Sequence, residues 1–157
     1  MATHLMESLG VADHRLDIAF IGPKRMRQVN QQWRGKDRST DVLSFPQCRF
    51  RTPLEPGRCV ARARETAEQP TSSPMLGDII ISMEDAARNA ASDGGPVARE
   101  VGFLIVHGLL HLGGHDHERP AERRRMFAAQ EALMKQLENR SSGPMWRRCV
   151  RIAGERA

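Results

Sequence analysis

Tyrosine is absent from this chain, and aromatic residues as a whole make up only 4% of it. So few rings argue against a nucleic-acid-binding sheet that stacks several bases on aromatic side chains. No run of eighteen apolar residues occurs, which argues against a transmembrane helix. The cysteines, Cys48, Cys59 and Cys149, are odd in number and widely spaced, so they indicate neither a disulfide framework nor a thiolate metal site.

Lysine is also rare, and arginine supplies all but three of the 24 basic residues in a chain of net charge +5. The planar guanidinium group suits phosphate better than a point charge does. The basic excess is compatible with a nucleic-acid partner, although a solvated surface gives the same balance. The N-terminal residues show neither a secretory apolar core nor the acid-free pattern of a transit peptide. We therefore expect a cytoplasmic protein with no membrane partner.

The segment 107–117 reads HGLLHLGGHDH and contains the densest cluster of potential metal ligands. His107 and His111 stand four residues apart, so on a helix they project from one face and can share a metal ion. The paired glycines that follow predict the end of that helix. His117 follows at the spacing of the third ligand in the metzincin signature. These three imidazoles predict a site for one catalytic Zn²⁺ per chain, with other divalent metals as alternatives.

Position 108 distinguishes this segment from the metalloproteases that share its spacing. Those enzymes carry there the glutamate that acts as general base, whereas this chain has Gly108. Peptide hydrolysis is therefore disfavoured, and a zincin-like metallopeptidase stays open only as an alternative. Glu100, two turns before His107 on the same helical face, is a candidate to accept a ring hydrogen from a ligand, and a simple surface acid is the open alternative. Asp116 is a second candidate acceptor.

Hydrophobic periodicity predicts a mixture of helices and strands along the chain. Helices are expected over 3–12, 23–34, 85–91, 96–112 and 120–137, and strands over 15–22, 42–45 and 76–82. In the first strand, Leu16, Ile18 and Phe20 should face one way. The helix that carries the histidines is apolar nearly all round, which places it at the centre of the domain. The predicted fold class is α+β (mixed α/β), with a small mixed sheet covered by helices around this buried metal-binding helix.

At 157 residues the chain has the size of one domain, which we place at 1–139. The proline-rich stretch 47–75 lacks helical or strand periodicity and is predicted to be a flexible loop insertion. Residues 140–157 are rich in arginine without an apolar pattern, which predicts a basic tail that is disordered or contacts RNA.

Three blocks of this sequence resemble one known family. The segment 107–117, NQQWRGKDRSTDVLSFP at 30–46 and LGDIIIS at 76–82 are similar to the YbeY family, in the family's order, within a similarity that covers residues 16–137. Its members are metal-dependent, single-strand-specific endoribonucleases. The resemblance implies a zinc-dependent endoribonuclease that acts on single-stranded ribosomal RNA, with the small ribosomal subunit as partner and no DNA substrate. Small-subunit 3′-end maturation and ribosome quality control are the implied processes.

The resemblance also implies roles for single residues. Arg34 is the implied catalytic residue that holds a phosphate, although composition alone equally fits a charged surface turn. His115 stands where the family usually has an aromatic residue. Its role stays open between a substrate contact, a competing ligand and a replacement for that ring. The family usually has a strand before its first helix, so we expect a sheet that lacks one strand unless translation starts at another codon. A non-catalytic assembly factor with a structural metal is the second alternative.

Overall fold

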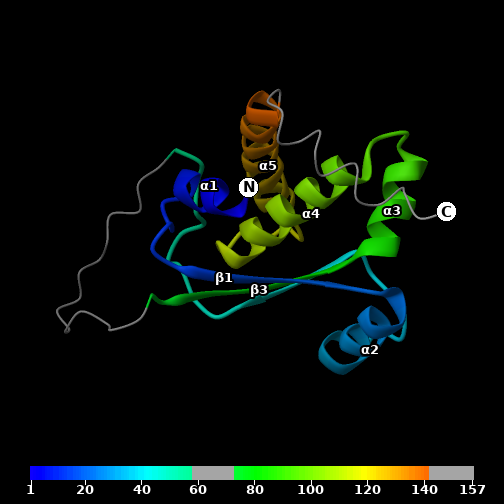
Figure 1. Ribbon diagram of the computed structural model, residues 1–157. Coiled ribbons are helices and arrows are strands. Elements are labelled where there is room, and N and C mark those ends of the chain that lie inside the picture. The colour runs from blue at the N-terminus through cyan, green and yellow to red at the C-terminus, as the bar shows by residue number, and fades with distance from the viewer. Residues whose placement is uncertain (58–72, 142–157) are drawn as a thin grey trace.

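A computed structural model describes residues 1–57 and 73–141 of the chain (Figure 1). Their elements are, in order, α1 (Ala2–Ser8), β1 (Arg15–Ile21), α2 (Pro23–Arg34), β2 (Val42–Pro46), β3 (Met75–Ser82), α3 (Met83–Ser92), α4 (Val97–Leu112) and α5 (Pro120–Ser141). The strands form one mixed sheet of order β1-β3-β2, in which β1 runs parallel to β3 and β2 runs antiparallel to it. The predicted α+β class is confirmed.

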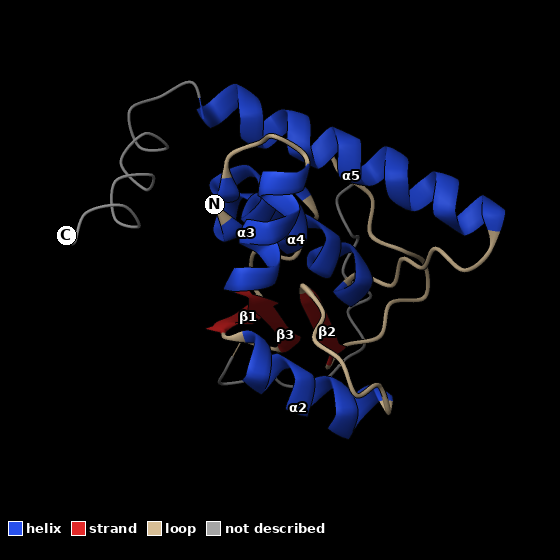
Figure 2. Ribbon diagram, turned by 90° about the vertical axis from the view of Figure 1, so that its right-hand side faces the viewer, coloured by secondary structure: helices blue, strands red, loops and turns tan. Residues whose placement is uncertain are grey.

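Helix α4 occupies the centre of the molecule, as its apolar character predicts. It packs against β2 and β3 on one side and against α3 and α5 on the other. Figure 2 shows α3, α4 and α5 on one side of the sheet and α2 on the opposite side. Six large apolar side chains of α4 are at most 2% exposed: Leu104, Ile105, Val106, Leu109, Leu110 and Leu112. The two histidines of α4 are therefore carried by a helix that is packed on both sides in the core.

Gly108 lets α4 lie close to the sheet. A Cβ atom at this position would come within 2.9 Å of Cδ1 and 3.1 Å of Cγ1 and Cγ2 of Ile79 on β3. Real Cβ atoms do not approach other carbon atoms this closely, so any larger residue would push the helix and the strand apart. Position 108 thus faces the sheet and belongs to the packing of the core.

Three sequence-based expectations differ from the structure in detail. Helix α1 ends at Ser8 because Gly10 takes a left-handed φ of 72° and the Val11 N–H returns to the Met6 carbonyl oxygen at 2.9 Å. Helix α3 starts directly after Ser82, whose hydroxyl donates to the Asp85 carboxylate. Leu16 and Ile18, from the face predicted for Leu16, Ile18 and Phe20, pack against the core, but Phe20 is 53% exposed near the end of a strand that has one neighbour in the described sheet.

The predicted domain limits are not tested by these observations. The tail from residue 142 onward and residues 58–72 of the predicted loop insertion lie outside the described part of the chain. Within the described part, the sheet has three strands. No helix in that part combines the length and the apolar character needed to cross a membrane.

Candidate metal centre

Three imidazole rings meet where α4 ends. His107, His111 and His117 each offer a ring nitrogen, and these atoms all lie within 4.8 Å of one another. The first two come from the last turns of α4 and the third from the loop that follows. Gly114 makes the turn between them with a φ of 86°, whereas Gly113 has an ordinary φ of −78°. The predicted cluster is present, and one of its two glycines needs the left-handed conformation.

Hydrogen bonds on the far side of two rings determine which nitrogens face the centre. Nδ1 of His107 lies 3.0 Å from the side-chain oxygen of Gln130 on α5, and Nδ1 of His111 lies 3.1 Å from the carbonyl oxygen of His115. Both acceptors are oxygens, so each Nδ1 carries the hydrogen of a neutral ring and each Nε2 is left with a lone pair. This is the pattern by which neighbouring groups orient metal-binding histidines.

The donor set fits a divalent metal ion. The Nε2 atoms of His107 and His111 lie 3.1 Å apart, and two lone pairs at this distance repel each other unless a cation lies between them. Zinc–nitrogen bonds of about 2.0–2.1 Å in tetrahedral geometry place neighbouring nitrogens about 3.3 Å apart. Nδ1 of His117 is buried and has no hydrogen-bond partner among the described residues. An ion bound by these imidazoles would satisfy the converging nitrogens.

The local environment also favours the neutral, metal-binding form of His111. Burial, followed by the neighbouring imidazoles of His107 and His117, lowers the pKa of His111 to about 4 in the metal-free site. The ring is therefore uncharged near neutral pH, and little free energy is needed to remove a proton before a metal binds.

Of the two acids expected to support the ligands, one lies at the site and the other does not. Asp116 accepts the backbone N–H of His117 at 2.7 Å, and its carboxylate lies 3.9 Å from Nδ1 of the same residue. Glu100 instead accepts from the Asn89 side chain at 3.3 Å. Among the described residues it has no hydrogen bond to an imidazole, so the structure favours the alternative of an acid that does not support a ligand.

Gln130 was not among the residues predicted for the site, although the sequence contained a signal for it. Met126 and Leu133 of α5 are both 0% exposed, and Gln130 lies between them on the same helical face. A polar residue inside a buried stripe needs a hydrogen-bond partner, and here the partner is His107. Its place in the stripe could therefore have indicated a contact with the metal helix.

His115 is a structural contact. Its ring is only 4% exposed, and its Nε2 lies 2.6 Å from the carbonyl oxygen of Leu54. The Leu54 N–H in turn donates to the Gly113 carbonyl oxygen at 2.9 Å. His115 thus fixes the stretch 47–57 against the end of α4, while its own carbonyl oxygen orients His111. It is not a member of the three-histidine cluster.

Arg34, predicted from sequence to serve the site, lines the same cleft as the three histidines. The cleft has a volume of about 680 Å³. Its lining comes from the end of α4 and the histidine loop, and from α2, β2 and their connection, which contribute a basic wall that includes Arg34, Lys36 and Arg38. The Arg34 Nη2 lies 3.4 Å from the carbonyl oxygen of Ser44 on β2. Folding therefore brings cationic side chains into the same cleft as a candidate metal centre that is distant in sequence.

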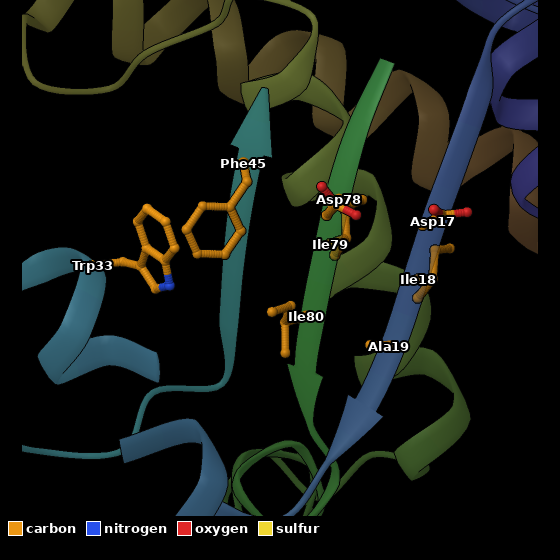
Figure 3. Close-up of a pocket in the computed structure, with 8 residues that line it drawn as sticks. All are labelled: Asp17, Ile18, Ala19, Trp33, Phe45, Asp78, Ile79 and Ile80. Atoms are coloured by element: carbon orange, nitrogen blue, oxygen red, sulfur yellow. The ribbon is translucent and has the colours of Figure 1, made fainter. Parts of the chain in front are cut away.

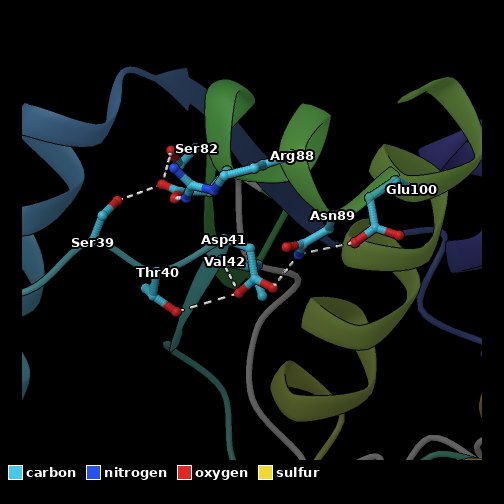
Figure 4. A network of polar contacts seen from close by, with 9 residues as sticks. Ser39, Thr40, Asp41, Val42, Ser82, Arg88, Asn89 and Glu100 are labelled. Atoms are coloured by element: carbon cyan, nitrogen blue, oxygen red, sulfur yellow. Dashed lines mark hydrogen bonds and ion pairs between the residues drawn. The ribbon is translucent and has the colours of Figure 1, made fainter. Parts of the chain in front are cut away.

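A network of polar contacts holds the connection between α2 and β2 in place (Figure 4). The buried carboxylate of Asp85 on α3 accepts the Ser39 hydroxyl and pairs with Arg88. Asp41 accepts from the Asn89 side chain at 3.0 Å. Because α3 packs on α4, these contacts fix the basic wall of the cleft relative to the histidines.

Comparisons with known proteins identify the family of the chain. A family model described as endoribonuclease YbeY matches residues 1–138. The chain is 42% identical over 137 residues to an endoribonuclease YbeY from Anaeromyxobacter sp. strain Fw109-5, covering 87% of this chain and 61% of that protein. It is 38% identical over 130 residues to the endoribonuclease YbeY of Thermus thermophilus, covering 83% of this chain and 81% of that protein.

A solved structure shares the fold. The solution structure of a Thermotoga maritima protein superimposes with a TM-score of 0.50 at 23% identity, covering 98% of this chain and 93% of that one. The match to two Anaeromyxobacter relatives spans about three fifths of their length, 61% in each case. The family model and the Thermus relative cover enough sequence to settle membership: the chain belongs to the YbeY family.

Proposed function

We propose that this chain is a metal-dependent endoribonuclease specific for single strands, with Zn²⁺ bound by His107, His111 and His117. The observation that carries the proposal is the shared cleft, which is lined by the three converging imidazoles and by Arg34. The names of the relatives, endoribonuclease YbeY, support the same reaction class.

Each group in the cleft has a distinct role in this proposal. A divalent ion held by the imidazoles would supply Lewis-acid activation of a water molecule and of a phosphoryl oxygen. Arg34 holds the scissile phosphate and stabilises the negative charge that develops on it, since its planar fork can donate two parallel hydrogen bonds. Lys36 and Arg38 line the same cleft and attract the RNA backbone.

We further propose ribosomal RNA of the small subunit as the substrate, with 3′-end maturation and ribosome quality control as the processes. The small ribosomal subunit is then the partner, and the cytoplasm is the compartment. Family membership supports these assignments, together with the net charge of +5 that favours a nucleic-acid partner.

The packing of Gly108 argues against a metallopeptidase. The glutamate base of such enzymes would have to stand at this position, but a side chain here would collide with Ile79 of β3. The cleft therefore cannot receive a general base from position 108.

Elemental analysis combined with a cleavage assay tests the proposed function. Purified protein should contain one zinc ion per chain and cleave single-stranded RNA but neither duplex RNA nor a peptide. Chelation should abolish cleavage, and added zinc should restore it. RNA binding without any metal-dependent cleavage would contradict the proposal and favour an assembly factor with a structural metal.

A further inference from the structure

Trp33 is the most exposed large hydrophobic side chain in the described part of the chain, with 62% of its surface accessible. Its indole nevertheless has a fixed neighbour. The ring of Phe45 on β2 meets it edge to face, with centroids 5.8 Å apart and planes at 69° (Figure 3). An aromatic pair in this geometry is favourable beyond the area it buries. Phe45 thus braces the indole while much of its surface stays open to solvent.

The aromatic pair borders an apolar hollow of about 450 Å³ on the outer face of the sheet. Side chains alternate along β3, so Ile79 faces α4 while Ile80 faces this hollow. The acidic residues of the hollow are Asp17 on the edge strand β1 and Asp78 on the central strand β3 (Figure 3). Trp33 lies on the opposite flank, beyond β2. A phosphate chain is repelled by the acidic flank and not by the flank that carries the indole.

Neighbouring residues connect the indole to the basic cleft. Arg34 directly follows Trp33, and the carbonyl oxygen that Arg34 contacts belongs to Ser44, which directly precedes Phe45. Consecutive Cα atoms are about 3.8 Å apart. A nucleic-acid strand advances by about 3.4 Å or more per nucleotide. The spacing of Trp33 and Arg34 along α2 thus matches one step of the strand, so a phosphate at Arg34 and its neighbouring base can meet two consecutive residues that line the two hollows.

We propose that Trp33, braced by Phe45, stacks on a base of single-stranded RNA adjacent to the phosphate held by Arg34. The inference rests on the proposed function and adds a base-binding subsite to it. One indole suffices for one base, so the low aromatic content of the chain is no obstacle. A base within a duplex is already covered by its stacked neighbours, so this subsite selects single strands. Lys36 and Arg38 in the adjoining cleft favour RNA over a protein segment as the occupant.

Two oligomers of equal length separate stacking from phosphate binding: a short oligoadenylate and its abasic ribose-phosphate counterpart. Binding is measured on the full chain with chelator present, so that no cleavage occurs. Trp33→Leu should weaken oligoadenylate binding by about tenfold, the usual scale for one base–aromatic contact, and leave abasic binding unchanged. Trp33→Phe should recover most of the affinity. Phe20→Leu, which removes another exposed ring outside the hollow, should change the affinity for neither oligomer.

Indole fluorescence gives an independent readout. In a Trp146→Phe background Trp33 is the single indole of the chain, and oligoadenylate should quench its emission while the abasic oligomer should not. Equal losses on both oligomers in Trp33→Leu, or no loss on either, would overturn the stacking subsite. Arg34→Ala should weaken both oligomers alike, because it removes a phosphate contact. If the unaltered chain binds neither oligomer, the subsite fails, whereas the proposed function fails only if the zinc-loaded chain does not cleave single-stranded RNA.

Discussion

Gln130 of α5 orients His107 of α4 through a hydrogen bond of 3.0 Å between its side-chain oxygen and the ring Nδ1. The contact makes α5 part of the candidate metal centre, although α5 supplies no ligand. It also ties the outermost helix to the end of α4, where two of the three imidazoles lie. Metal affinity should therefore depend on a residue that never touches the metal.

Replacement of Gln130 tests this dependence. Gln130→Met keeps the volume but removes the acceptor, so zinc affinity should fall by about 10–100-fold, as found for groups that orient metal ligands. Gln130→Glu keeps an acceptor and should retain the affinity. Competition against a chromophoric chelator measures the difference. Gln136→Met is the matched control. Gln136 lies on the same helix but outside the site, where its side-chain oxygen accepts the Ser8 hydroxyl at 2.8 Å. Equal zinc affinity in all three variants would remove Gln130 from the metal centre.

His115 and His117 should behave differently when each is replaced by alanine. His117→Ala should lose the metal, because it removes one of three ligands. His115→Ala should keep it but lower the free energy of unfolding by about 1–3 kcal/mol, because the buried Leu54 carbonyl oxygen loses its hydrogen-bond donor. Metal content and urea unfolding of both variants distinguish the loss of a metal ligand from the loss of a structural contact. A metal-free His115→Ala protein beside a metal-loaded His117→Ala protein would reverse the ligand assignment.

Local patterns made most of the fold and the histidine cluster predictable. The four-residue spacing of His107 and His111 needs only a helix to bring the rings together, and the apolar surface of α4 predicts its burial. Contacts between distant segments were not predictable in the same way. Helical spacing placed Glu100 on the histidine face, but its partner is Asn89 on α3, and only tertiary packing decides that. The pairing of His115 with Leu54 likewise depends on how the stretch 47–57 crosses the end of α4.

Gly108→Ala should destabilise the protein. The added methyl group meets Ile79 at 2.9–3.1 Å, and overpacking of this kind costs about 1–3 kcal/mol. Alanine favours a helix over glycine by about 1 kcal/mol, which offsets part of that cost. Urea unfolding should show a net loss on the order of 1 kcal/mol. Gly95→Ala is the control, because nothing lies within 4 Å of a Cβ at that position. A gain in stability for Gly108→Ala would show that α4 and β3 can separate freely.

The stability of the metal-free protein should depend on pH through His111. Its pKa falls from an ordinary 6.5 to about 4 on folding, so between these values the unfolded chain binds more protons than the folded one. The free energy of unfolding should therefore decrease as the pH is lowered through this window. Urea unfolding in chelator at a series of pH values measures the slope. His111→Gln removes the titrating ring and should flatten the slope; an unchanged slope would assign it to other groups.

Arg34→Ala should separate metal binding from catalysis. Within residues 1–57 and 73–141 the side chain makes one long hydrogen bond, to the Ser44 carbonyl oxygen at 3.4 Å, so its loss should leave metal content and thermal unfolding nearly unchanged. RNA cleavage should fall on the order of a hundredfold, the usual effect of removing one donor that stabilises transition-state charge. Arg34→Lys should recover only part of the rate, because an ammonium group keeps the charge without the bidentate fork.

Arg25→Ala gives the matched control for Arg34→Ala, since it removes an equal charge from the same helix. Arg25 is exposed, contacts Gln28 at 3.1 Å and is not among the residues that line the cleft. The Arg25→Ala variant should cleave RNA at nearly the rate of the unaltered protein. At most a small loss is expected, from the weaker long-range attraction between the protein and RNA. Equal rate losses in the two variants would mean that Arg34 contributes only net charge. Loss of metal from Arg34→Ala would make the arginine part of the structure of the site, because a phosphate-binding side chain has no reason to affect the ion.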